Sequence, residues 1–148
     1  MSKSHPAKIF LAVIVGLIVG MACNLALVEV NFIFYPPPAD LSMGDTEGFR
    51  QYMSTLPLTA YFIPILAHLS QAFVGALVAA RICISQPLLP AMIVGSLSLL
   101  GGIINALILP VPIWMWAEMP FYLILSRYAA KLIMQRQPAQ APHEGLED

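Results

Sequence analysis

The chain has 148 residues, of which 59% are hydrophobic and only 10% are charged, and its formal net charge is −1. Soluble domains carry about 25% charged residues, so a water-soluble fold of this composition would lack the polar surface to cover itself. The near-neutral charge also excludes the basic field that binds nucleic acid, and we expect no nucleic-acid partner. The composition predicts an all-α membrane protein.

Four apolar runs follow one another along the chain, each close to or above the roughly 20 residues that span a bilayer as a helix. They cover about 9–34, 57–84, 89–109 and 112–134. We predict an up-and-down four-helix transmembrane bundle, with residues 1–8 before it and an outer loop at 35–56. The polar, proline-containing segment 135–148 is predicted to be a disordered tail. The first run is too long for the core of a signal peptide, so we expect it to be a retained helix.

Prolines mark most of the predicted helix boundaries. The run at 36–38 ends the first helix, because proline donates no amide hydrogen and its ring clashes with the preceding turn. Pro57, Pro90 and Pro112 fall at first turns, where proline is tolerated. Pro64 falls inside the second predicted helix and Pro120 inside the fourth, so each is expected to kink its helix.

Basic residues indicate the orientation in the membrane. With four spans, the two chain ends and the 84–89 connection share one side, and six of the seven basic residues lie there. Only Arg50 lies on the other side. Basic residues favour the cytoplasmic side, so we predict a bacterial inner-membrane protein with both termini in the cytoplasm. The six residues are Lys3, Lys8, Arg81, Arg127, Lys131 and Arg136.

The outer loop carries a short amphipathic segment. Asp45 is a plausible helix N-cap, and Glu47 follows it in the first turn. Phe49, Tyr52 and Met53 have i, i+3, i+4 spacing, which predicts one apolar helical face lying on the outer surface.

Three stretches of the chain resemble a known family. They are YPPPADLSMGDTEGFRQYMSTLP, AHLSQAFVGALVAAR and LLGGIINALILPVPIWMW, and the resemblance extends over roughly 29–125. This combination is similar to a widespread, uncharacterised family of small bacterial inner-membrane proteins with four transmembrane helices. The resemblance implies the four-helix fold and brings no activity with it.

Ionisable and amide side chains are costly inside a bilayer, so each one is a candidate for a functional site. Counting about 1.5 Å per residue from the outer helix ends places one set of polar residues in the outer half of the membrane and a second set near mid-depth. The first comprises Glu29, Asn105 and Glu118, and the second comprises Asn24, His68 and Gln71.

These residues suggest an outward-facing polar cavity that could relay protons or bind a cation or a polar head group. Glu29, His68 and Glu118 could also form a transition-metal set. A depth difference of about 7 Å between Glu118 and His68, from the same count, argues against that set. We therefore predict no metal and no cofactor. The alternative is structural, because amides and histidines often link membrane helices by hydrogen bonds.

Small residues recur at four-residue spacing, most clearly at Gly16 and Gly20, and Gly75 lies in a similar pattern in the second predicted helix. Such patterns allow helices to approach closely, and we expect close packing with a possible homo-oligomer through these glycines.

No nucleotide-binding, zinc-protease or nucleophile-elbow motif is present, and no CxxC. Three function hypotheses remain. The first is a non-enzymatic protein that binds a lipid, an ion or a partner protein, with membrane lipids as its surroundings. The second is a small transporter or channel, and the third is a membrane enzyme that acts on a lipid or quinone.

Overall fold

The computed structural model describes residues 5–42, 44–109 and 111–136. In this part of the chain all regular structure is helical, which confirms the all-α fold class. The elements in order are α1 (Pro6–Phe34), α2 (Thr46–Thr55), η1 (Leu58–Tyr61), α3 (Phe62–Ile82), α4 (Leu88–Ile108), η2 (Ile113–Glu118) and α5 (Met119–Gln135), where η denotes a 3₁₀-helix. Most of the predicted tail lies outside the described residues.

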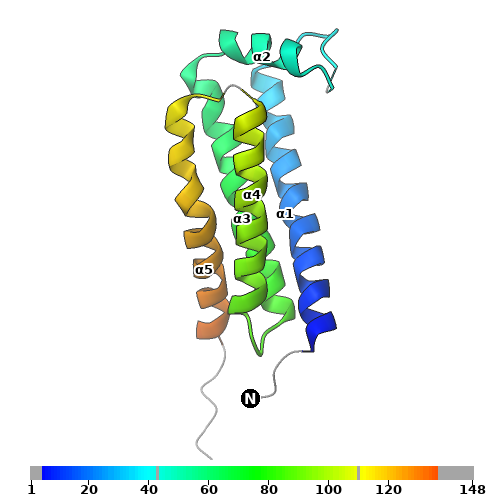
Figure 1. Cartoon of the computed structure of the whole chain (residues 1–148), viewed down its shortest axis with the longest axis vertical. Coiled ribbons are helices and arrows are strands. Elements are labelled where there is room, and N and C mark those ends of the chain that lie inside the picture. Colours follow the sequence, from blue (N-terminus) through cyan, green and yellow to red (C-terminus); the bar gives the residue numbers. More distant parts are fainter. Residues whose placement is uncertain (1–4, 43, 110, 137–148) are drawn as a thin grey trace, which may run out of the picture.

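The four longest helices lie side by side, and α2 crosses one end of the bundle (Figure 1). α1 begins and α5 ends at the opposite end, which also carries the short α3–α4 connection. Both α3 and α4 contact each of the other three long helices, and α3 is the central one because its contacts are the most extensive.

Glycine sets the distance between α1 and α3. A Cβ added to Gly16 would lie 2.5 Å from the carbonyl oxygen of Gly75, and one added to Gly20 would lie 2.5 Å from that of Gln71. Only a residue without a side chain permits this backbone approach. The glycines suggested for an oligomer thus pack α1 against α3 within one chain, and the homo-oligomer stays a prediction.

Alanine fills the half of the bundle below the glycine contacts. Its core cluster joins α1, α3, α4 and α5 and contains Ala76, Ala79, Ala80, Val94, Ala129 and Ala130, each completely buried. These small side chains let the four helices pack tightly, because each adds little volume between the helix axes.

Two predicted helices are each divided in the structure. The predicted 57–84 helix consists of η1 and α3, and the predicted 112–134 helix consists of η2 and α5. Pro64 and Pro120 consequently fall in the first turns of α3 and α5, where a missing amide hydrogen breaks no helical bond. The predicted mid-helix kinks at these prolines are therefore wrong.

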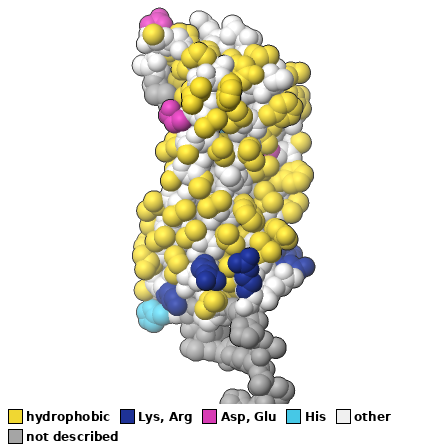
Figure 2. All heavy atoms as spheres, turned by 180° about the vertical axis from the view of Figure 1, so that it is seen from behind, with side chains coloured by type: hydrophobic (Ala, Val, Ile, Leu, Met, Phe, Trp, Pro, Cys, Tyr) yellow, Lys and Arg dark blue, Asp and Glu magenta, His cyan; other side chains and the backbone are white. Residues whose placement is uncertain are grey.

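The outer wall of the bundle is apolar. α1, η1 with α3, and α4 are each long and apolar enough to span a membrane, whereas α5 has 17 residues. Hydrophobic side chains cover much of the face in Figure 2, and basic side chains gather toward the end opposite α2. The large hydrophobic side chains of Phe10, Ile18 and Leu107 are exposed, and so many exposed side chains of this kind require an apolar environment such as lipid. These features identify a membrane protein.

Candidate functional site

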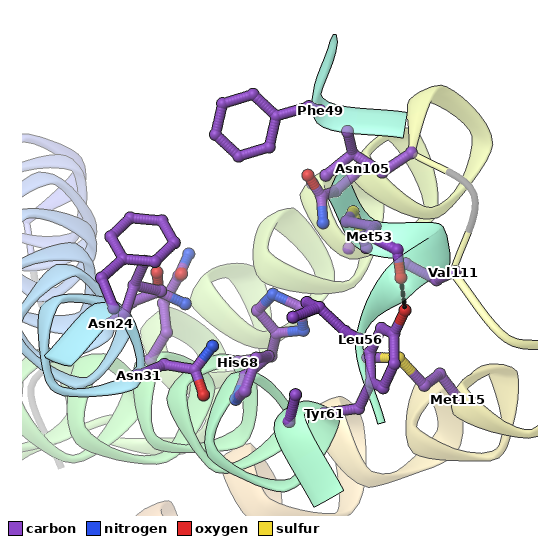
Figure 3. A pocket seen from close by; sticks show the side chains of 18 of the residues that line it. Asn24, Asn31, Phe49, Met53, Leu56, Tyr61, His68, Asn105, Val111 and Met115 are labelled. Carbon is purple, nitrogen blue, oxygen red and sulfur yellow. Dashed lines mark hydrogen bonds between the residues drawn. The ribbon is translucent and has the colours of Figure 1, made fainter. Parts of the chain in front are cut away.

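A cavity of about 430 Å³ lies in the half of the bundle nearest α2 (Figure 3). Most of its wall is apolar, and α2 contributes Phe49, Tyr52, Met53 and Leu56. Ligand cavities commonly have volumes of about 300–1,000 Å³ with a few polar groups among apolar ones. The polar side chains that line this cavity are Asn24, Asn31, Tyr52, Tyr61, His68, Gln71, Ser98, Asn105 and Tyr122.

Four of the six predicted site residues line this cavity: Asn24, His68, Gln71 and Asn105. They come from α1, α3 and α4, and Figure 3 shows His68 and Asn105 directed toward a shared space. The structure thus brings the mid-depth residues together with one residue of the outer group.

Glu29 does not join them. Its side chain lies on an exposed face of α1 and does not line the cavity. The hypothesis of two neighbouring carboxylates, and the metal set that includes Glu29, therefore have no geometric support. Among the described residues no group of three metal-ligating side chains is found.

Glu118 lies beside the cavity and contacts His68. Its Oε1 atom is 3.0 Å from Nδ1 of His68 and accepts a hydrogen bond of 3.3 Å from the hydroxyl of Tyr122. The side chain of Glu118 is 5% exposed and that of His68 is 19% exposed. A carboxylate this deeply buried needs such partners, since an unpaired charge in an apolar interior is very costly.

A depth difference of about 7 Å between His68 and Glu118 was expected to keep their side chains apart. That expectation is wrong, because the two side chains meet at 3.0 Å. The count assumed continuous α-helices that begin at one plane, at about 1.5 Å per residue. Both segments instead open with a 3₁₀-helix, which rises about 2.0 Å per residue, but because η1 has 4 residues and η2 has 6, this reduces the difference by only about 1 Å. The lengths of the two side chains cover the remaining separation.

No family model, curated protein or solved structure matches this chain. The resemblance to the uncharacterised four-helix family thus stays a prediction, and the site has to be interpreted from its own geometry.

Three buried polar atoms near the cavity have no hydrogen-bond partner among the residues that the structure describes: Asn31 Oδ1, Ser98 Oγ and Glu118 Oε2. The residues are 5%, 2% and 7% exposed. Buried polar atoms are almost always paired, so unpaired ones point to a water or ligand in the site. Asn31 and Ser98 line the cavity itself.

Five polar residues of this site were not among the predicted site residues: Asn31, Tyr52, Tyr61, Ser98 and Tyr122. Asn31 lies seven residues after Asn24, which is two helical turns, so both amides share one face of α1. This spacing in the sequence could have indicated that Asn31 belongs to the same site as Asn24. Tyr122 lies four residues after Glu118, but a tyrosine near a helix end more often marks the membrane interface. Nothing in the sequence around Ser98 indicated that this residue belongs to the site.

Hydrogen bonds hold α2 over the cavity. The Tyr52 hydroxyl donates to the carbonyl of Tyr35 just beyond the end of α1, and the Tyr61 hydroxyl donates to the carbonyl of Met53 at 2.8 Å. Arg50 donates to the carbonyl of Ile108 in the last turn of α4 at 3.4 Å. This contact also places a positive charge at the negative end of the helix dipole.

The start of α2 follows its predicted cap. The Asp45 side chain accepts a hydrogen bond from the amide of Gly48 at 2.9 Å.

Burial, with a smaller contribution from Tyr61, raises the pKa of the Tyr52 hydroxyl above its ordinary value of 10.0. The hydroxyl therefore stays a hydrogen-bond donor to Tyr35 throughout the neutral range.

Proposed function

We propose that this protein binds an uncharged amphipathic molecule from the membrane in the cavity beneath α2. The cavity carries this proposal, because its wall is mostly apolar while polar side chains from all five α-helices and from η1 line it. The unpaired atoms of Asn31 and Ser98 would hydrogen-bond the polar part of the ligand. The apolar wall would surround its hydrocarbon part.

The polar lining favours an uncharged head group. No lysine or arginine lines the cavity within the described residues, although these side chains are the usual partners of phosphate. The amides of Asn24, Asn31, Gln71 and Asn105 both donate and accept hydrogen bonds, as hydroxyl and carbonyl groups of a neutral lipid or quinone require.

The proposal places the protein in a bacterial inner membrane with four spans, α5 being the fourth. The positive-inside pattern supports cytoplasmic termini, because Lys8, Arg81, Arg127, Lys131 and Arg136 all lie toward the end of the bundle opposite α2. The cavity then opens in the outer half of the membrane, under α2 on the outer surface.

Photolabelling tests this function. The purified protein in lipid nanodiscs would be illuminated with a diazirine-bearing monoacylglycerol, and in a parallel sample with a diazirine-bearing phosphatidic acid. We expect the neutral probe to label cavity residues such as Val28, Phe32 and Met53. Equal labelling by the acidic probe, or labelling only of the exposed outer wall, would contradict the proposal.

A second candidate function is acid–base chemistry on the bound molecule. Glu118 holds Nδ1 of His68 at 3.0 Å, while the imidazole lines the cavity with its other nitrogen available. A histidine fixed in this way can take a proton from a ligand hydroxyl and return it, as general base and acid. This candidate keeps the membrane-enzyme hypothesis open for a lipid or quinone.

Conversion of the ligand separates the two candidates. If the site acts chemically, a membrane extract incubated with the wild-type protein changes composition, and His68→Gln abolishes the change while the photolabel remains. If the site only binds, lipid analysis finds the extract unchanged with either protein. The transporter hypothesis has less support, since alanines fill the bundle below the cavity.

A further inference from the structure

A second hollow lies at the other end of the bundle, between α3 and α5. It has a volume of about 350 Å³ and is bounded by the aliphatic side chains of Leu77, Val78, Ile82, Leu132 and Ile133. Arg81 and Arg136 complete its lining. We call this hollow the basic groove.

The two arginines lie near the carboxyl ends of neighbouring helices. Arg81 is in the last turn of α3 and Arg136 is the C-cap of α5, and both side chains are exposed. Within the described residues, neither guanidinium lies within ion-pair distance of a carboxylate. Two guanidinium groups thus lie beside an apolar groove, near the carboxyl ends of α3 and α5.

This combination suits one kind of molecule. Arginine binds phosphate through two parallel hydrogen bonds, and aliphatic side chains accommodate an acyl chain. Basic pockets between transmembrane helices are typical sites for anionic phospholipid head groups. We propose that the basic groove binds an anionic phospholipid of the adjacent leaflet, with its phosphate between Arg81 and Arg136 and one acyl chain along Val78 and Leu132.

The groove is distinct from the cavity beneath α2. The two share no lining residue, because the part of α3 that lines the cavity ends at Gln71 and the part that lines the groove begins at Leu77. The groove also differs from the cavity in charge, because two arginines line it and no asparagine or glutamine does. This inference stands whether or not the proposed function is correct.

Native mass spectrometry from mixed-lipid nanodiscs would test the inference on the full chain. The probes are phosphatidylglycerol and, for comparison, zwitterionic phosphatidylcholine. A basic residue near an anionic surface contributes about a fivefold factor, so Arg81→Gln with Arg136→Gln should weaken phosphatidylglycerol retention about 25-fold. Phosphatidylcholine carries the same phosphate but no net charge, so its retention should fall less than that of phosphatidylglycerol.

A matched control removes the same charge elsewhere on the bundle. Arg127→Gln with Lys131→Gln also loses two cations from exposed positions of α5, but neither residue lines the groove. We expect this variant to keep most of the phosphatidylglycerol. An equal loss in both double variants would show a diffuse electrostatic effect and overturn the site.

A third variant tests the acyl chain. Val78→Trp fills the groove and keeps both arginines, so it should lower phosphatidylglycerol retention severalfold. Excess inorganic phosphate should fail to displace the lipid, because the chain contributes to binding. Full retention by Val78→Trp, or complete displacement by phosphate, would overturn the proposal of a seated lipid, and circular dichroism would confirm that each variant is helical.

Discussion

His68 on α3 and Glu118 at the end of η2 meet at 3.0 Å inside the bundle, although 50 residues separate them in sequence. The contact joins the central helix to the last one beside the cavity. Tyr122 adds a hydroxyl from the first turns of α5, so a single carboxylate oxygen receives two partners. The free oxygen of the same carboxylate is buried without a partner.

The energetic coupling between His68 and Glu118 can be measured by a double-mutant cycle. We expect His68→Ala and Glu118→Ala to be non-additive by about 1 kcal/mol in the free energy of unfolding in detergent. As the control, His68→Ala combined with Ile124→Ala, an exposed position of α5, should be additive within about 0.5 kcal/mol. Additivity of the first pair would mean that the contact does not hold in the membrane protein.

Asn31→Leu should stabilise the ligand-free protein. The buried Oδ1 atom of Asn31 has no partner, and an unsatisfied buried polar atom costs about 1–3 kcal/mol. The same substitution should weaken the retention of a neutral amphiphile. Detergent unfolding of delipidated protein gives the first quantity and photolabel yield the second. A destabilised variant would indicate that Asn31 is a structural link between helices.

Gly16→Ala should destabilise the bundle by about 1–3 kcal/mol, because the new methyl group would overlap the Gly75 carbonyl and overpack α1 against α3. Gly101→Ala is the matched control. Nothing lies within 4 Å of a Cβ at Gly101, so alanine should there be neutral or stabilising by up to about 1 kcal/mol. Equal effects of the two substitutions on unfolding in detergent would contradict the α1–α3 contact.

High pH should release α2 from the end of α1. The pKa of Tyr52 is raised in the folded protein, so the stabilising effect of its hydrogen bond is present below pH 10.0 and is lost as pH rises through the folded pKa. An ultraviolet titration of tyrosine ionisation, taken as the difference between wild type and Tyr52→Phe, should show a midpoint above 10.0. A midpoint at or below that value would place Tyr52 in solvent.

The sequence was sufficient for the helical class and for helix positions close to those observed, because long apolar runs have few alternatives in a bilayer. It also identified Asn24, His68, Gln71 and Asn105 as polar residues with reason to converge. Their convergence follows from a simple cost: polar groups avoid lipid and therefore face the bundle interior.

Sequence reasoning failed where position depended on the reach or direction of a side chain. Counting residues gave the depth of the backbone alone and took no account of the reach of the His68 and Glu118 side chains, which meet at 3.0 Å. Glu29 was grouped with the site by its depth alone, whereas its helix face directs it away. Depth was thus a weaker predictor than the angular position around the helix.

The central claim is that the cavity beneath α2 holds an uncharged amphiphile. The most direct measurement is native mass spectrometry of wild type, Gly101→Phe and Leu100→Phe released from membrane-derived nanodiscs. Gly101 lines the cavity with open space at its Cβ, so phenylalanine should fill the cavity, whereas Leu100 is 54% exposed and serves as the control. We predict a neutral adduct on wild type and Leu100→Phe that is lost from Gly101→Phe. A bare wild-type protein, or an adduct that persists in Gly101→Phe, would contradict the claim.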